Sequence, residues 1–113
     1  ASYSNPREAA VAARECGAPA IELHTGVYAD AVDAVSRSRE LKIVQAATDL
    51  GTHLGLHVNA GHGLNYDNVQ PIARISGLRE LNIGHSIVAQ AIFVGMEQAV
   101  RGMVQLLREA RLP

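Results

Sequence analysis

Basic charge, cysteine and long apolar runs are all scarce in this sequence of 113 residues. Ten Lys and Arg side chains against eleven Asp and Glu give a net charge of −1, so no basic field exists to attract nucleic acid or anionic lipid. Cys16 is the only cysteine, which excludes an internal disulfide and a zinc site built from several cysteines. A single cysteine fits a reducing cytoplasm, and we expect Cys16 to be a small buried side chain near a helix end.

Signals for membrane insertion and targeting are missing as well. No run of 18 apolar residues occurs, so no transmembrane helix is predicted. The opening "ASYSNPREAA" has neither the basic cluster nor the apolar region of a signal peptide, and it does not start with Met. We therefore expect a segment of a longer protein. Apolar residues make up 48% and charged residues 19%, a balance typical of one globular unit.

Helix-like and strand-like segments alternate along the chain. Asn5 is the expected cap of the first helix, Pro6 opens its first turn, and Gly17 and Gly51 are expected to end the first two helices. Helices are expected over residues 6–16, 29–50, 67–77 and 86–111, and strands over residues 19–25, 53–61 and 78–85. The order α-β-α-β-α-β-α predicts parallel strands joined by crossover helices.

Each expected strand has one apolar and one polar face, because successive side chains point to opposite sides. The polar faces carry Glu22, His24, His57, Asn59, Glu80 and Asn82, opposite Ile21, Leu23, Leu56, Val58, Leu81 and Ile83. An open doubly wound sheet would have central strands that are apolar on both faces, since helices cover both. We therefore predict an α/β fold of the (β/α)8 TIM-barrel type, with helices outside and a polar mouth.

Apolar stripes at helical spacing mark the two longest expected helices, and we expect both stripes to face the core. They comprise Val32, Val35, Ile43, Ala46 and Ala47 in the first, and Val88, Ile92, Met96, Ala99, Met103 and Leu106 in the second.

The second and third strands end in the same signature, Asn59-Ala60-Gly61-His62 and Asn82-Ile83-Gly84-His85. Barrels of this type place their active sites at the carboxyl ends of the strands. A glycine there lets a ligand approach the backbone closely. The two signatures therefore predict a ligand site at this end of the sheet.

Three side chains near the strand ends are candidates for proton transfer. Glu22 lies in the middle of a strand on the inward face, where loss of water suits a carboxylate to this work, although an interior ion pair would also place it there. His62 stands between two glycines, and histidine titrates near neutral pH; the alternative is a loop histidine bonded to a backbone carbonyl. His24 has the weaker case, and we expect it to orient Glu22 or a substrate.

Gly84-His85-Ser86 opens the last expected helix and is a candidate phosphate site. Free backbone N–H groups at a helix start bind anions, and barrels commonly bind phosphate after their last two strands. The alternative is an ordinary helix cap. A zinc site from Glu22, His24 and His62 lacks the H-x-H or HExxH spacing, and the sole lysine, Lys42, lies within a helix far from any strand end. Neither a metal nor a cofactor is expected.

The segments "IELHTGVYAD" (21–30) and "LHVNAGHGLNYDNVQPIARISGLRELNIGHSIVAQAIFVG" (56–95), with their spacing, resemble the pyridoxine 5′-phosphate synthase family over essentially the whole chain. The resemblance implies a (β/α)8 barrel with extra helices that assembles as a homo-octamer. It also implies condensation of 3-amino-2-oxopropyl phosphate with 1-deoxy-D-xylulose 5-phosphate, which releases phosphate and water. Residues 1–113 align with the last three strands, so we expect one segment, the C-terminal part of the barrel domain.

The resemblance also implies roles for five residues. His62 matches the proton-donating histidine of the family, and Glu22 matches the glutamate that stabilises the transition state. Gly63, Gly84 and His85 match positions that bind the aminoketone phosphate. The early-strand histidine and glutamate that the family uses as bases have no counterpart here, so we expect the isolated segment to be inactive.

Two other functions remain open. The first is a non-catalytic phosphate-binding half-barrel that assembles with itself or with a partner chain. The second is another barrel acting on sugar phosphates, such as an aldolase or an epimerase. The absence of a strand lysine and of metal-ligand spacing counts against the second.

Overall fold

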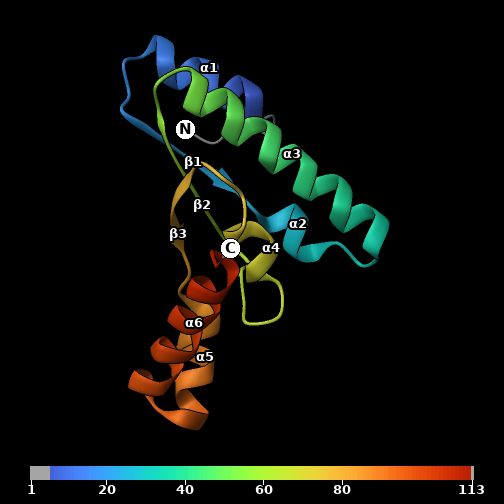
Figure 1. Cartoon of the computed structure of the whole chain (residues 1–113), viewed down its shortest axis with the longest axis vertical. Helices are drawn as coiled ribbons and strands as arrows, with labels where there is room; N and C mark the ends of the chain where they lie inside the picture. The colour runs from blue at the N-terminus through green and yellow to red at the C-terminus, as the bar shows by residue number, and fades with distance from the viewer. Residues whose placement is uncertain (1–5, 113) are drawn as a thin grey trace.

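The computed structural model describes residues 6–112 and contains a parallel sheet of three strands in the order β1-β2-β3 (Figure 1). The strands are β1 (Ala20–His24), β2 (His57–Gly61) and β3 (Leu78–Asn82). The helices are α1 (Pro6–Glu15), α2 (Gly26–Asp30), α3 (Ala34–His53), α4 (Val69–Ala73), α5 (His85–Val94) and α6 (Met96–Ala110). The predicted alternation and the parallel pairing are confirmed. The expected cap Asn5 lies outside the described residues.

The register of the sheet places the carboxyl ends of the strands side by side. His24 pairs with Gly61, and Gly61 pairs in turn with Asn82. An irregularity between Val58 and Asn59 shifts the pairing of β2 with β3, so that Asn59 lies beside Glu80. The two predicted signatures therefore end at one edge of the sheet.

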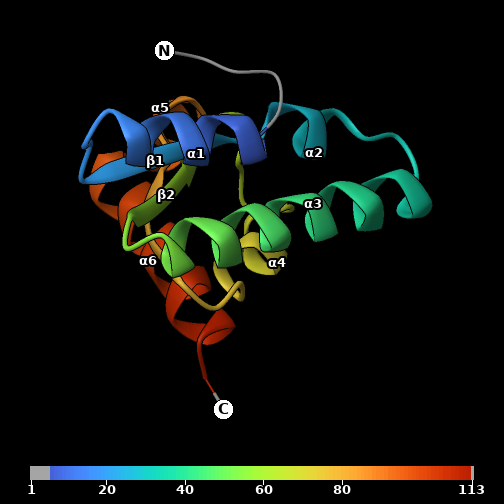
Figure 2. The ribbon, with the colours of Figure 1, turned by 90° about the horizontal axis from the view of Figure 1, so that it is seen from above.

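One face of the sheet packs against helices and the other lies open. The buried core joins strand residues to side chains from α2, α3, α4 and α6: Leu23, Val58, Ala60 and Leu78 with Tyr28, Val44, Ala47, Val69, Ile72 and Met103. The opposite face is polar, and Glu22, Glu80 and Asn82 are exposed on it. Figure 1 and Figure 2 both show α1 beside α3. The predicted division into an apolar and a polar face is confirmed.

The helix expected over residues 29–50 is interrupted, which corrects that prediction. Ala31 adopts an extended conformation after α2, and the Asp33 carboxylate then caps α3 by accepting a hydrogen bond from the Ser36 amide at 2.7 Å. Val32 precedes α3 and Val35 lies in its first turn, and they are 93% and 71% exposed. Ile43 and Ala46 are exposed as well, so Ala47 is the one buried residue of the expected stripe, and the prediction that the stripe faces the core is wrong for the other four. The side chains that α3 buries are Val44, Ala47 and Thr48.

Gly51 lies within α3 instead of ending it, since the helix continues to His53. A Cβ atom at Gly51 would lie 2.6 Å from Cγ2 of Val58 and 3.3 Å from Cδ1 of Ile21. The glycine therefore allows α3 to pack closely against the sheet. Gly51 is therefore needed for the close packing of α3 on the sheet, and it does not mark the end of the helix.

The helix expected over residues 86–111 is two helices, α5 and α6, which form a hairpin (Figure 1). Gly95 separates them with φ +88° and ψ 154°, a conformation that other residues adopt only with strain. Because the chain reverses there, the expected stripe is split. Met103 is buried in the core, whereas Ile92 on α5 is 80% exposed.

Cys16 is exposed just after α1, so the expectation that it is buried was wrong. The predicted helix end beside it is confirmed, because Gly17 has a φ of +75° and follows the last helical turn. No helix within residues 6–112 is long and apolar enough to cross a membrane.

Candidate functional site

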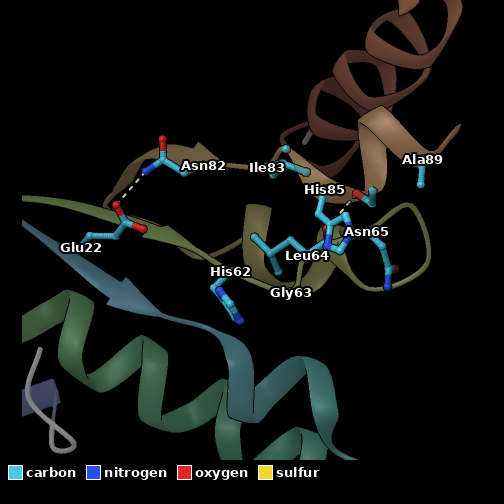
Figure 3. Close-up of a pocket in the computed structure, with 11 residues that line it drawn as sticks. Glu22, His62, Gly63, Leu64, Asn65, Asn82, Ile83, His85 and Ala89 are labelled. Atoms are coloured by element: carbon cyan, nitrogen blue, oxygen red, sulfur yellow. Dashed lines mark hydrogen bonds between the residues drawn. The ribbon is translucent and has the colours of Figure 1, made fainter. Parts of the chain in front are cut away.

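A pocket of about 780 Å³ opens at the carboxyl ends of the strands (Figure 3). Five predicted site residues line it: Glu22, His62, Gly63, Gly84 and His85. They come from β1, the loop after β2, the loop after β3 and the start of α5. Its other lining residues are Leu64, Asn65, Asn82, Ile83, Ser86 and Ala89. The fold therefore brings together the five residues for which the family resemblance implied roles, whereas the candidate His24 does not line the pocket.

Glu22 is held on the open face of the sheet by a residue two strands away. Asn82 donates a hydrogen bond from Nδ2 to Oε2 of Glu22 at 2.9 Å (Figure 3). The bond crosses β2 at Gly61, where a Cβ atom would lie 2.9 Å from Oε1 of Glu22 and from Cβ of Asn82. Only a glycine leaves room for this crossing. Glu22 is exposed, so the loss of water that was expected for this carboxylate is absent in the described structure.

Asn59 lies between Glu22 and Glu80 in the register of the same face. Its Oδ1 atom is buried, and it has no hydrogen-bond partner within the described part of the chain. A buried acceptor without a partner destabilises the folded state, by roughly 1–3 kcal/mol. The polar face therefore holds an acceptor that a further donor would satisfy.

His62 has a backbone conformation that is unusual for its residue type. With φ +89° it is the one non-glycine residue of positive φ in the described chain, a state that costs roughly 1–3 kcal/mol. Thr25, which is fully buried, holds it there: its Oγ1 lies 2.7 Å from the carbonyl oxygen of His62 and 2.8 Å from that of Gly61. The side chain of His62 is exposed.

Thr25 was not among the predicted site residues. A threonine that follows a strand carries no signal of its own in the sequence. Only the pairing of β1 with β2 brings its hydroxyl to the backbone of Gly61 and His62, where its amide also donates to the Gly61 carbonyl at 2.9 Å.

His24 was expected to orient Glu22 or a substrate, but the neighbour that its ring contacts is His62. The two rings are stacked, with centroids 4.2 Å apart and planes inclined by 26°. The Gly26 amide donates to Nδ1 of His24 at 3.2 Å. At the opposite end of β2, Nδ1 of His57 lies 2.6 Å from Nη1 of Arg79, and neither residue lines the pocket.

The start of α5 lines the pocket with Gly84, His85 and Ser86. The Val88 amide makes the first bond of the helical ladder, to the Gly84 carbonyl, so the amides of residues 85–87 precede that ladder. Ser86 donates from Oγ to the Leu64 carbonyl at 2.9 Å, which ties this first turn to the loop after β2. The arrangement is typical of an anion-binding site.

Gly63 belongs to the loop that Ser86 anchors. Its φ is +76°, and a Cβ atom there would lie 2.7 Å from Cβ of Ala29, so no other residue fits. The side chain of Asn68 holds the loop through two hydrogen bonds. Its Nδ2 donates to the Gly63 carbonyl at 3.1 Å, and its Oδ1 accepts from the Asn65 amide at 2.8 Å. The two asparagines were also missed by the sequence analysis, because their role depends on the closed loop.

Within residues 6–112 the structure contains no cluster of side chains that could coordinate a metal ion. Among residues 6–112, no three His, Cys, Asp or Glu side chains are arranged to hold an ion. The pocket supplies an imidazole, a carboxylate and backbone amides, which suit proton transfer and anion binding.

A family model and several named proteins are similar to this chain, and both indicate the same family. The family model described as "Pyridoxal phosphate biosynthesis protein PdxJ" matches residues 3–109. Proteins of the Corby, Lens and Paris strains of Legionella pneumophila, each named pyridoxine 5′-phosphate synthase, are 55% identical to this chain over 101 residues. The match covers 89% of this chain and 41% of each relative, so the chain spans about two fifths of their length. Because the family model covers nearly the whole sequence, the chain belongs to the pyridoxal phosphate biosynthesis protein PdxJ family.

Proposed function

We propose that this chain is the C-terminal part of a (β/α)8 barrel and that the intact protein is a pyridoxine 5′-phosphate synthase. It condenses 3-amino-2-oxopropyl phosphate with 1-deoxy-D-xylulose 5-phosphate and releases phosphate and water. One observation carries the proposal: the acid–base candidates Glu22 and His62 line the same pocket as the phosphate-site candidates Gly63, Gly84 and His85. The names of the Legionella relatives support it.

His62 and Glu22 carry the proton chemistry in this proposal. Closing the pyridine ring requires repeated proton transfers and the loss of water, and such steps need a positioned acid and a positioned carboxylate. His62 donates a proton to a departing oxygen, and Glu22 stabilises the positive charge that develops on the substrate. The hydrogen bond from Asn82 supports this role, because it orients the carboxylate over the polar face.

The phosphate of the aminoketone binds at the start of α5 in this proposal. The amides of residues 85–87 and the positive end of the helix dipole favour a dianion. Gly63 and Gly84 let it approach the backbone, and Ser86 keeps the two loops together through its bond to Leu64.

The intact protein is proposed to be a cytoplasmic homo-octamer, as the family resemblance implies. The apolar surface of the α5–α6 hairpin supports an assembly, because Ile92 and Phe93 are 80% and 84% exposed. Exposed apolar patches of this kind mark surfaces that become covered.

The test is an assay of the intact protein, of the length of its relatives, with both phosphorylated substrates. We expect pyridoxine 5′-phosphate to form only when both are present, and mixtures that lack one substrate are the controls. Binding of phosphate without any product would favour the non-catalytic half-barrel. Cleavage or epimerisation of a sugar phosphate, with no pyridoxine 5′-phosphate, would contradict the proposal in favour of another barrel enzyme.

A further inference from the structure

The ring of His24 is the closest aromatic neighbour that the structure gives to His62. The two centroids lie 4.2 Å apart and the planes are inclined by 26°, the geometry of a stacked pair. The two residues are 38 positions apart in the chain, and the pairing of His24 with Gly61 in the sheet brings them together. Contact on one face of the His62 ring restricts its rotation about the Cβ–Cγ bond.

The His24 ring is itself held in place by Gly26. The Gly26 amide donates to Nδ1 at 3.2 Å, and a ring nitrogen that accepts a hydrogen bond carries no proton. The ring proton of neutral His24 is therefore on Nε2. A Cβ atom at Gly26 would lie 2.5 Å from Cε1 of His24 and 3.2 Å from Cδ2 of His62. Glycine at this position leaves the space that both rings occupy.

Thr25 fixes the backbone of His62 while His24 contacts its ring. The Thr25 hydroxyl lies 2.7 Å from the His62 carbonyl, and residue 62 is held at φ +89°. A backbone held in this way leaves the side-chain torsions as the remaining freedom of His62. The consecutive residues His24 and Thr25 thus contact the ring and the backbone of His62, and Gly26 holds the His24 ring.

We propose that His24 is a positioning residue, whose stacked ring holds the His62 imidazole in the orientation for proton transfer. The proposal rests on the catalytic role proposed for His62. His24 itself does not line the pocket, and it acts through His62 and not on the substrate. Its effect is on the rate of the chemical step, and substrate affinity depends on other residues.

The first test measures kinetics of the intact protein. His24→Ala removes the stacked ring and is expected to lower kcat roughly tenfold to a hundredfold, with KM for both substrates changed less than about twofold. His24→Phe keeps a ring over His62 and is expected to restore most of kcat. His53→Ala, at the far end of α3, is the matched control and is expected to leave kcat unchanged. Unchanged kcat in His24→Ala, or an equal loss in His24→Phe, would overturn the proposal.

The second test observes the contact without any turnover. In the NMR spectrum of the intact protein, the ring protons of His62 are expected to be shielded by the stacked His24 ring. They are expected to move downfield in His24→Ala and to stay close to their original positions in His24→Phe. Gly26→Ala, which displaces the His24 ring by steric contact, is expected to act like His24→Ala. Ring resonances of His62 that do not move in either alanine variant would overturn the proposal.

The two tests separate this proposal from the proposed function. A protein that forms no pyridoxine 5′-phosphate, but whose His62 resonances move as expected, would refute the function and leave the contact established. A protein that forms the product, with His62 resonances that do not respond to His24, would refute the positioning role alone. Should His24→Ala fail to fold, His24→Phe and Gly26→Ala carry the same comparison.

Discussion

The side-chain amide of Asn82 on β3 donates to the carboxylate of Glu22 on β1 at 2.9 Å, across the full width of β2 and sixty positions apart in the chain. Gly61 on the intervening strand has no side chain to block the contact. The orientation of the carboxylate is therefore set by two neighbouring strands. A substitution at Gly61 or at Asn82 should therefore displace the Glu22 carboxylate, although Glu22 itself is unchanged.

Replacement of Asn82 tests this dependence. In the intact protein, Asn82→Ala frees the Glu22 carboxylate and is expected to lower turnover roughly tenfold to a hundredfold, since a misplaced catalytic group loses about that much. Gly61→Ala should have a similar effect, because the added methyl group would contact Oε1 of Glu22. Glu80→Gln, a change on the same exposed face, is the control. Wild-type turnover in Asn82→Ala would show that the bond does not matter for catalysis.

Substitution of His62 separates its chemistry from its backbone strain. His62→Asn should lower turnover of the intact protein at least about a hundredfold, because general acid–base catalysis contributes about that much or more. Asparagine tolerates positive φ, so this variant should still fold. Near-normal turnover in His62→Asn would refute the assignment of His62 as the proton donor.

The backbone strain at residue 62 is tested by stability. His62→Gly should have a free energy of unfolding about 1–2 kcal/mol higher than His62→Ala, measured in denaturant, because only glycine adopts φ +89° freely.

Substitution of Gly84 by alanine tests the proposed phosphate site. A Cβ atom at Gly84 would meet nothing within 4 Å, so Gly84→Ala should fold normally while its methyl group enters the space of the anion. We expect affinity for 3-amino-2-oxopropyl phosphate to fall about tenfold, or about 1.4 kcal/mol, by titration calorimetry of the intact protein. Unchanged affinity would place the phosphate elsewhere.

Gly102→Ala is the matched control for that experiment. Gly102 lies within α6, and a Cβ atom there would lie 3.6 Å from the Tyr66 ring, an ordinary contact. Since glycine destabilises a helix interior relative to alanine, this variant should raise the free energy of unfolding by roughly 0.5–1 kcal/mol. Its affinity for the phosphate should equal that of the unmodified protein.

Tyr28 offers a test of the core beside the site. Its hydroxyl donates to the Asn68 carbonyl at 2.6 Å, and Tyr28→Phe should lower the free energy of unfolding by about 1 kcal/mol at neutral pH. Burial raises the pKa of Tyr28 above its ordinary 10.0, and the charge of Arg37 opposes this in part. A raised pKa gives stability that is complete below the unfolded pKa and is lost as pH rises through the folded pKa. The difference between the two proteins should therefore shrink in alkaline solution, as measured by urea unfolding. A constant difference would contradict the burial of the phenol.

The chain of 113 residues should be catalytically silent on its own. In the structure β1 and β3 each have a neighbour on one side only, and Glu22 and Asn82 are exposed to water. Open strand edges and exposed apolar residues such as Phe93 favour association. Assay with both substrates should show no product, and analytical ultracentrifugation should show self-association or a poorly packed monomer. Turnover by a well-folded monomer would refute the half-barrel argument.

The positions of the strands and the two faces of the sheet were predictable from the sequence alone. Alternation of apolar and polar residues is local, so Leu23 and Val58 could be assigned to the core and Glu22 to the open face before any packing was known. The glycine-flanked ends of β2 and β3 predicted which residues meet at the pocket. The catalytic and binding roles of those residues stay predictions.

Only the tertiary structure decided how the helices break and which side chains support the site. The apolar spacing from residue 86 to 111 is the same for one helix or two, whereas in the structure the chain reverses at Gly95 and α6 packs against α4. The contacts of His24 and Thr25 with His62, and of Asn82 with Glu22, come from the register between strands. Register depends on packing between residues that are far apart in the chain, and no local pattern of residues specifies such a contact.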